Sequence, residues 1–97
     1  MAAKVSPAEV IAELNARKGN LRCSEVTKFL KSLGFEVKEG KSPGHKIFTH
    51  DKLNDFFSGS YNCGHGKNPE IKRAYIGKIV GILEYHQSTL EAELGGK

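Results

Sequence analysis

The chain has 97 residues, of which 38% are hydrophobic and 27% charged, and its formal net charge is +4. This length allows one small domain, and this composition excludes a wholly disordered chain. No apolar run approaches the ~20 residues that a membrane-spanning helix needs, and residues 1–5 lack the apolar segment of a signal peptide. We therefore expect a cytoplasmic protein with a single domain over residues 1–97.

The charge is spread unevenly along the chain. Glu84, Glu91 and Glu93 fall within residues 84–94, where no base occurs, so the preceding body is more basic than the whole chain. A basic body suits a polyanion such as RNA, although a solvated lysine surface has the same composition. We interpret residues 85–97 as an acidic C-terminal tail, which is either a solvated helix or a segment that folds over the basic surface.

The first predicted helix has several agreeing start signals. Ser6 can cap the helix, Pro7 suits the first helical position, and Glu9 completes a capping box. Gly19 is a typical stop. The pattern predicts a helix over roughly residues 7–18.

A second amphipathic helix follows. Ser24 is its predicted N-cap and Gly34 its predicted stop. Apolar residues recur at i, i+3, i+4 and i+7, the spacing of one buried helix face: Val26, Phe29, Leu30 and Leu33.

The period then changes to two, which predicts three strands. The first covers residues 35–38, the second residues 45–50 after a turn at 40–44, and the third residues 57–63. Short connections between them imply an antiparallel sheet. In the third strand the inward row consists of Phe57, Gly59, Tyr61 and Cys63.

The last helix is predicted to begin at Asn68-Pro69-Glu70, a cap followed by proline and an acid. Gly77 and Gly81 lie four residues apart, which we interpret as a place where the helix backbone closely approaches the sheet. The order α-α-β-β-β-α predicts an α+β fold in which helices cover one face of a three-stranded antiparallel sheet.

Cys23 and Cys63 are expected to be reduced thiols in a cytoplasmic chain. Two adjacent strands could bring His45, His50 and His65 near one another and near Cys63. Their spacing lacks the two close ligand pairs typical of structural zinc, so we expect no metal and no other cofactor. Cys63 lies in an apolar row, which favours a packed cysteine over a nucleophile.

His45 is the strongest candidate for chemistry. An imidazole exchanges protons near neutral pH, and RNA cleavage needs a base to take the proton of the 2′-hydroxyl group. Gly44 leaves room for a phosphate, and Lys41 and Lys46 flank the histidine with positive charge. The structural alternative is a surface histidine beside a turn.

A second candidate site precedes the last helix. His65 and Lys67 stand next to glycines just before the predicted helix start, which is a plausible cradle for an anion. The alternative for this segment is a hinge loop.

Three short segments occur in an order typical of one family. The run Leu30–Phe35 matches a helix ending in Leu-x-x-Leu-Gly-Phe, and His45–Phe48 matches a Gly-Ser-His-x-x-Phe strand, with Pro43-Gly44 in place of Gly-Ser. A third motif, His-x-x-Lys-Glu-Ile-Lys, is matched with a slight change of spacing by His65, Lys67, Ile71 and Lys72. Together these segments, over about residues 22–84, resemble the HicA family of toxins from bacterial toxin–antitoxin pairs. The helix at 7–18 precedes this core.

The resemblance implies a fold similar to a double-stranded-RNA-binding domain and a metal-independent endoribonuclease that cuts mRNA. It implies His45 as the single catalytic histidine and a HicB-like antitoxin protein as partner. Two alternatives stay open: a non-catalytic RNA-binding module, and a protein-interaction domain with a basic surface. The residues expected to hold RNA are Gly44, Lys46, Lys41, His65 and Lys67.

Overall fold

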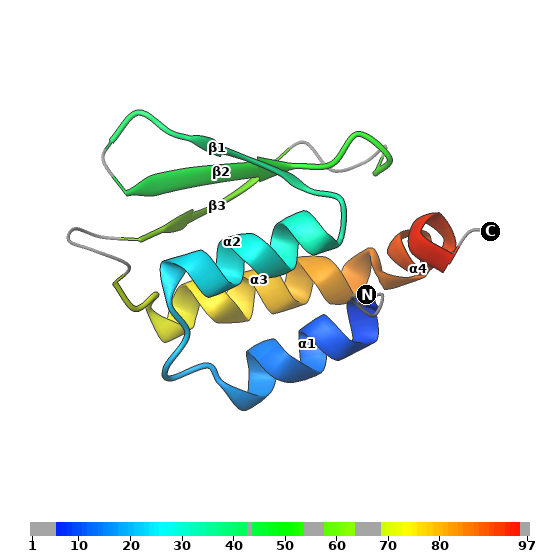
Figure 1. Ribbon diagram of the computed structural model, residues 1–97, viewed down its shortest axis with the longest axis horizontal. Coiled ribbons are helices and arrows are strands. Elements are labelled where there is room, and N and C mark those ends of the chain that lie inside the picture. Colours follow the sequence, from blue (N-terminus) through cyan, green and yellow to red (C-terminus); the bar gives the residue numbers. More distant parts are fainter. Residues whose placement is uncertain (1–5, 43, 54–57, 64–68, 96–97) are drawn as a thin grey trace, which may run out of the picture.

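The computed structural model describes residues 6–42, 44–53, 58–63 and 69–95. The elements are α1 (Pro7–Ala16), α2 (Cys23–Ser32), β1 (Glu36–Glu39), β2 (His45–Thr49), β3 (Gly59–Asn62), α3 (Arg73–Tyr85) and α4 (Gln87–Gly95). They form three layers: the sheet, then α2 with α3 beneath it, then α1 on the far side of α3 (Figure 1). The predicted α+β class is confirmed.

The sheet has β2 in its centre, paired antiparallel with β1 and β3, as predicted. Phe48 of β2 is fully buried beneath the sheet. It lies opposite Gly59 of β3, where an added Cβ would stand only 2.8 Å from Phe48 Cε1. Glycine at this position therefore leaves the room that the buried ring occupies.

The first helix begins with a capping box at its predicted residue, whereas the second has only half of one, because the side chain of its N-cap residue Arg22 carries no acceptor atom. In α1 the Ser6 hydroxyl accepts a hydrogen bond from the Glu9 N–H at 3.2 Å, as predicted. The α2 helix begins at Cys23, with Arg22 as N-cap, so the prediction that Ser24 caps it was wrong. The Glu25 carboxylate accepts the Arg22 N–H at 2.9 Å, which satisfies the backbone N–H of the N-cap residue itself.

The end of α2 follows its glycine signal. Gly34 adopts φ +94°, a left-handed conformation that glycine tolerates best. The next amide, of Phe35, donates back to the Leu30 carbonyl at 3.1 Å and turns the chain into β1.

The predicted start of the last helix was wrong by several residues. Residues 69–71 are not helical, and α3 begins at Arg73. The Cys23 N–H donates to the Pro69 carbonyl, and the Ile71 N–H donates to the Leu21 carbonyl, each at 2.9 Å. These tertiary hydrogen bonds hold the segment extended, so Pro69 introduces a strand-like pairing instead of a helix.

The interpretation of Gly77 and Gly81 was also wrong. Within the described part of the chain, a Cβ added at either glycine would have no neighbouring atom within 4 Å, so neither marks a close approach to the described sheet. The buried face of α3 consists of Ile76, Ile79, Val80 and Leu83.

The C-terminal segment is a helix at the end of the molecule away from the start of α3 (Figure 1). Leu90 of α4 is fully buried, and α4 contacts both α1 and α3. The acidic tail is therefore helical, as one alternative expected, but it packs against the core through Leu90 and is not simply a solvated helix.

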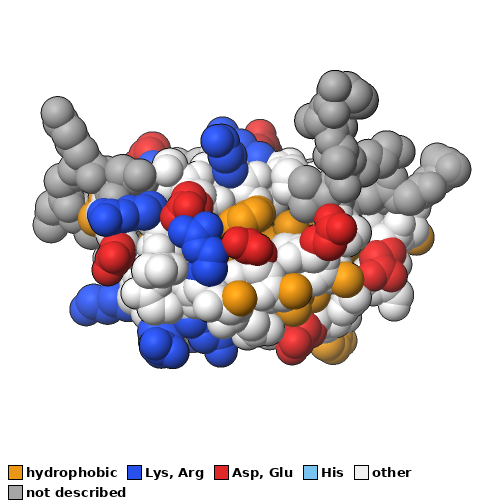
Figure 2. Space-filling view, turned by 60° about the horizontal axis from the view of Figure 1, so that its bottom comes forward, with side chains coloured by type: hydrophobic (Ala, Val, Ile, Leu, Met, Phe, Trp, Pro, Cys, Tyr) orange, Lys and Arg blue, Asp and Glu red, His pale blue; other side chains and the backbone are white. Residues whose placement is uncertain are grey.

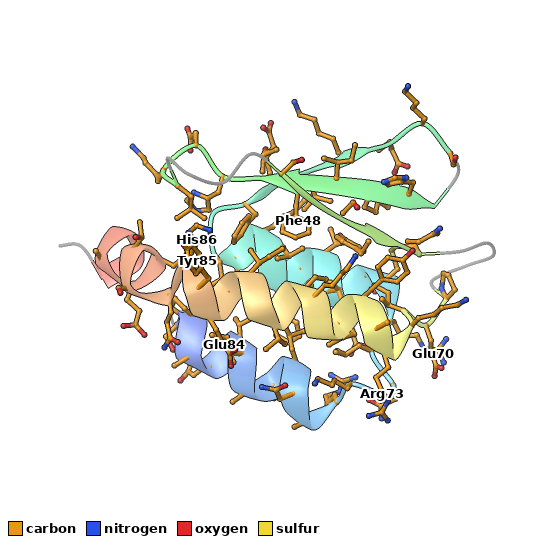
Figure 3. The ribbon with its side chains drawn as sticks, turned by 180° about the vertical axis from the view of Figure 1, so that it is seen from behind. Phe48, Glu70, Arg73, Glu84, Tyr85 and His86 are labelled. Carbon is orange, nitrogen blue, oxygen red and sulfur yellow. A yellow bond between two sulfur atoms is a disulfide. The ribbon has the colours of Figure 1, made fainter. Side chains whose placement is uncertain are left out.

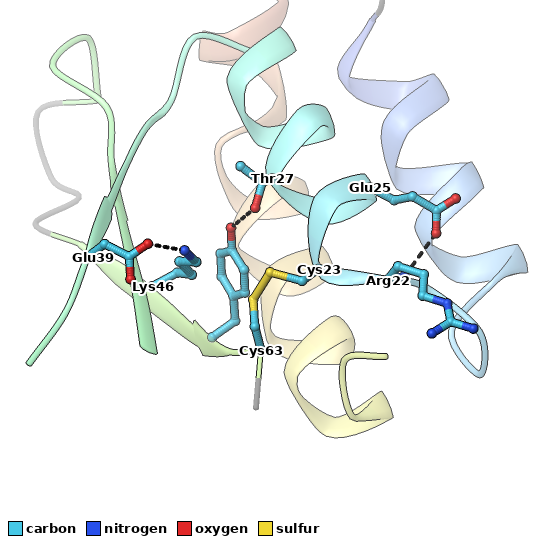
Figure 4. Close-up of a disulfide and its surroundings, with 8 residues drawn as sticks. Arg22, Cys23, Glu25, Thr27, Glu39, Lys46 and Cys63 are labelled. Carbon is cyan, nitrogen blue, oxygen red and sulfur yellow. Dashed lines mark hydrogen bonds and ion pairs between the residues drawn. A yellow bond between two sulfur atoms is a disulfide. The ribbon is translucent and has the colours of Figure 1, made fainter. Parts of the chain in front are cut away.

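Cys23 and Cys63 form a disulfide, with their Cα atoms 5.4 Å apart, so the expectation of two reduced thiols was wrong. The bond joins the first turn of α2 to the end of β3 (Figure 4). These two cysteines are 40 residues apart in sequence, and only the packing of the helix under the sheet brings them together. Among the described residues, no helix is both long and apolar enough to cross a membrane.

Candidate functional site

His45 is the first residue of β2 and lies on the sheet face away from the helices. Side chains alternate along a strand, so His45 and Ile47 share this open face while Lys46 and Phe48 face the helices. The imidazole is half-buried because it lies against Gly40, where an added Cβ would stand 2.9 Å from both Cγ and Cδ2 of His45. Among the described residues, no side-chain hydrogen bond or ion pair engages the ring.

The turn before His45 is held by backbone hydrogen bonds. The His45 N–H donates to the Ser42 carbonyl at 3.0 Å, and the Gly40 N–H donates to the His45 carbonyl at 2.7 Å. Gly44 has φ +83°, and its carbonyl accepts the Cys63 N–H at 2.7 Å. The backbone around the imidazole is therefore tied to both neighbouring strands, while Pro43 lies outside the described residues.

Two residues beside His45 were missed by the sequence reasoning. Asn62 of β3 is its direct cross-strand partner, and Lys38 of β1 is opposite Ile47, one diagonal step away on the same face. The Lys38 ammonium is 3.9 Å from the Glu36 carboxylate, and both side chains are exposed. The alternation of the strands was visible in the sequence, but the register that makes these residues neighbours of His45 was not.

Lys46 does not lie with His45, which corrects the expectation that it flanks the histidine. It points to the helix side of the sheet, is mostly buried, and forms an ion pair with Glu39 of β1 (Figure 4). Beside it the hydroxyls of Thr27 and Tyr61 share a hydrogen bond of 2.7 Å, and burial raises the pKa of the Tyr61 phenol. Lys46 thus belongs to a polar cluster between α2 and the sheet.

Of the other residues expected to contact RNA, two lie within the described part of the chain and two do not. Lys41 is exposed in the connection between β1 and β2, and Gly44 lies directly before His45. His65 and Lys67 lie outside the described residues.

His50 is a structural histidine. It is buried, its Nδ1 accepts the Lys52 N–H at 3.2 Å, and its Nε2 lies 3.0 Å from the Leu33 carbonyl. Since Nδ1 accepts, the proton is assigned to Nε2, which donates to Leu33. The ring also meets Phe35 edge to face at 4.7 Å. Five residues of strand put it roughly 16 Å along β2 from His45, so the two do not form one site.

Metal ligation was considered for His50 and Cys63, and both are otherwise engaged, His50 in hydrogen bonds and Cys63 in the disulfide. Among the described residues, no three His, Cys, Asp or Glu side chains are grouped so that they could hold a metal ion.

Charge is unevenly distributed on the α1 side of the molecule. On this face, which Figure 2 shows, Lys and Arg gather toward the end where α3 begins, here called the basic end, whereas the half nearer α4 presents acidic side chains. Arg73 lies at the first end, and Glu84 lies toward the second (Figure 3). The start of β2, with Gly44 and His45, is also at the basic end (Figure 1). The candidate histidine therefore lies at the same end of the molecule as these cations, on the sheet face away from α1.

The candidate site thus comprises His45, Asn62 and Lys38 on the open sheet face, with Gly44 and Lys41 in the adjoining turn. Such a surface offers a proton-exchanging ring, an amide and two cations near the start of the central strand. Comparison of the chain with family models, curated proteins and solved structures finds no match.

Proposed function

We propose that the protein is an endoribonuclease of the HicA kind, which binds RNA at its basic end and cuts it with His45. The observation that carries this proposal is the position of His45: half-exposed on the open sheet face, beside a glycine turn, and at the basic end. The order of α2, three antiparallel strands and α3, with both helices on one sheet face, supports a fold similar to a double-stranded-RNA-binding domain.

The chemistry needs one base and one proton donor. Neutral His45 takes the proton of the ribose 2′-hydroxyl, and the 2′-oxygen then bonds to the adjacent phosphorus. The bond from phosphorus to the 5′-oxygen breaks, and that oxygen receives a proton from an imidazolium or from water. Lys38 and Lys41 supply positive charge for the phosphorane-like transition state.

The direct test compares wild type with His45→Ala in cleavage of a labelled RNA in the presence of a chelator. We expect cleavage to fall about 100-fold or more, as for loss of a general base, while RNA affinity changes little. Expression of both proteins from a tight promoter, followed by growth and mRNA integrity, repeats the test in cells. Equal cleavage by the two proteins would rule out His45 as the catalytic base.

A non-catalytic RNA-binding module is the second candidate. The pairing of Lys46 with Glu39 on the opposite sheet face favours it, because β2 itself then brings no cation to the His45 side. This candidate predicts that wild type binds RNA, leaves it intact, and loses affinity steeply as salt rises. RNA binding absent even at low salt would favour a protein-interaction domain instead.

The partner in this proposal is a HicB-like antitoxin that covers the His45 surface, and the location is cytoplasmic. Disulfides rarely persist in a reducing cytoplasm. A cytoplasmic location therefore predicts that Cys23 and Cys63 are reduced in the cell, which thiol alkylation of a rapidly quenched lysate measures directly.

A further inference from the structure

A cleft of about 290 Å³ opens at the basic end, away from the His45 face. It lies between the connection from α1 to α2 and the segment that leads into α3. Its lining residues are Lys18, Gly19, Glu70, Ile71, Lys72 and Arg73.

Tertiary hydrogen bonds set the walls of the cleft. Residues 69–71 pair with residues 21–23 through two backbone hydrogen bonds of 2.9 Å, and Arg22 stands opposite Glu70 in this short pairing. Arg73 reaches across the opening: a Cβ added at Gly19 would stand 3.0 Å from its Nη2 atom. Figure 3 shows Arg73 and Glu70 at this end of the molecule. The cations are thus carried by two segments that the fold holds together.

The charges in the cleft are not balanced within the described part of the chain. It is lined by three cations, Lys18, Lys72 and Arg73, and one acid, Glu70. None of these three cations has an ion-pair partner within 4.0 Å among the described residues, whereas the nearby Arg17 pairs with both Glu13 and Glu25. Like charges drawn together around a cleft repel one another, and an anion between them relieves that repulsion.

We infer that this cleft binds a backbone phosphate of RNA, as a second contact that anchors the strand whose cleavage is proposed at His45. The inference rests on the proposed RNA binding and adds a site for it. Phosphate suits the cleft because guanidinium and ammonium groups can donate to its oxygens from several sides. The site includes Lys18, which lies before the segment that resembles HicA toxins.

The cleft and the His45 turn are connected through a few backbone contacts. The Gly44 carbonyl accepts the Cys63 N–H, Cys63 lies beside Cys23 with their Cα atoms 5.4 Å apart, and the Cys23 N–H donates to the Pro69 carbonyl. We therefore expect one RNA strand to contact both surfaces, and this does not require the disulfide to be formed.

The test uses the double variant Lys72→Gln/Arg73→Gln. Its affinity for RNA is measured by fluorescence anisotropy at salt concentrations between about 50 and 300 mM. The matched control is Lys52→Gln/Lys78→Gln, which removes the same charge from two exposed side chains outside the cleft. We expect the cleft variant to bind about tenfold more weakly or worse, and its plot of log K against log salt to flatten by roughly 1 unit. The control should stay within about threefold of wild type. Thermal unfolding of all variants checks that each is folded.

The possible failures are distinguishable. If wild type binds RNA and the cleft variant matches the control in affinity and slope, the cleft inference is wrong and the proposed function stands. If wild type binds no RNA at low salt, both are overturned. Lys18→Gln provides an independent check, because it lies on the other wall of the cleft and should weaken binding in the same direction.

Discussion

Gly40 and His45 show how one missing Cβ positions a candidate catalytic group. The imidazole occupies the space where a side chain at residue 40 would begin. Gly40 was visible in the sequence only as part of a turn. In the structure the His45 ring packs directly against Gly40. The absence of a side chain at Gly40 therefore determines the position of the imidazole.

Gly40→Ala is expected to displace the His45 ring, because the new Cβ would stand 2.9 Å from its Cγ and Cδ2 atoms. RNA cleavage should fall about tenfold or more while RNA affinity is kept, since a misplaced base loses most of its advantage. Gly77→Ala is the matched control: its Cβ meets nothing within 4 Å, and it should leave cleavage unchanged and slightly stabilise α3. Unchanged cleavage by Gly40→Ala would contradict this role.

The ionisation of Glu25 couples stability to pH. The Arg22 N–H and the Arg17 guanidinium, which is 2.7 Å away, hold the pKa of its carboxyl below the ordinary value of 4.5. The stabilisation is therefore complete above pH 4.5 and is lost as pH falls through the lowered pKa.

Glu25→Gln should lower the free energy of unfolding by roughly 0.5–1 kcal/mol at pH 7. The difference from wild type should shrink as pH falls through the lowered pKa of Glu25, because the wild-type carboxyl then loses its charge too. Urea unfolding at a series of pH values measures this convergence. Glu36→Gln is the control, since its ion pair with Lys38 is long and exposed. A difference in unfolding free energy that stays constant from pH 7 to pH 2 would contradict the role given to the Glu25 carboxyl.

At the scale of elements, α2 and β3 are joined twice. The Cys23–Cys63 disulfide links the start of α2 to the residue after β3, and the Thr27–Tyr61 hydrogen bond links the same two elements one turn further on (Figure 4). Together they hold the helical layer under one edge of the sheet.

Reduction of the disulfide should lower the free energy of unfolding by about 2–4 kcal/mol, because it releases a closed loop of about 40 residues in the unfolded chain. Urea unfolding with and without a phosphine reductant gives the difference. Cys23→Ala/Cys63→Ala should unfold near the reduced wild type and should not respond to the reductant. Identical unfolding of oxidised and reduced wild type would show that the bond contributes nothing.

At the scale of the whole molecule, α4 and the candidate interface lie at opposite ends. The α4 helix closes the core at the acidic end, where Leu90 is fully buried, while His45 and the cleft lie at the basic end. Changes at one end should therefore leave the other largely unaffected, since distant independent sites contribute additively.

Leu90→Ala is expected to cost about 2–5 kcal/mol of stability, the range for removing a fully buried leucine side chain. RNA affinity of the folded variant should stay within about twofold of wild type, because no part of the proposed interface is near α4. Thr89→Ala, at an exposed neighbouring position, is the stability control. A large loss of affinity in folded Leu90→Ala would mean that the two ends are coupled.

The sequence alone was enough to predict the α+β class, the capping box of α1, the glycine stop of α2 and the antiparallel three-stranded sheet. These features depend on local signals: caps, glycines and the period of the apolar residues. It also singled out His45 as a candidate, through a turn followed by a strand. In the structure His45 is the first residue of the central strand, and its catalytic role stays a prediction.

The tertiary structure decided the features that depend on residues far apart in the chain. The Cys23–Cys63 bond, the extended segment before α3 and the helical packing of residues 87–95 all arise from long-range contacts. The same holds for the neighbours of His45: strand register, which no local pattern specified, placed Asn62 and Lys38 beside it and turned Lys46 to the other face. Local propensity decides which elements form, but only packing decides which side chains meet.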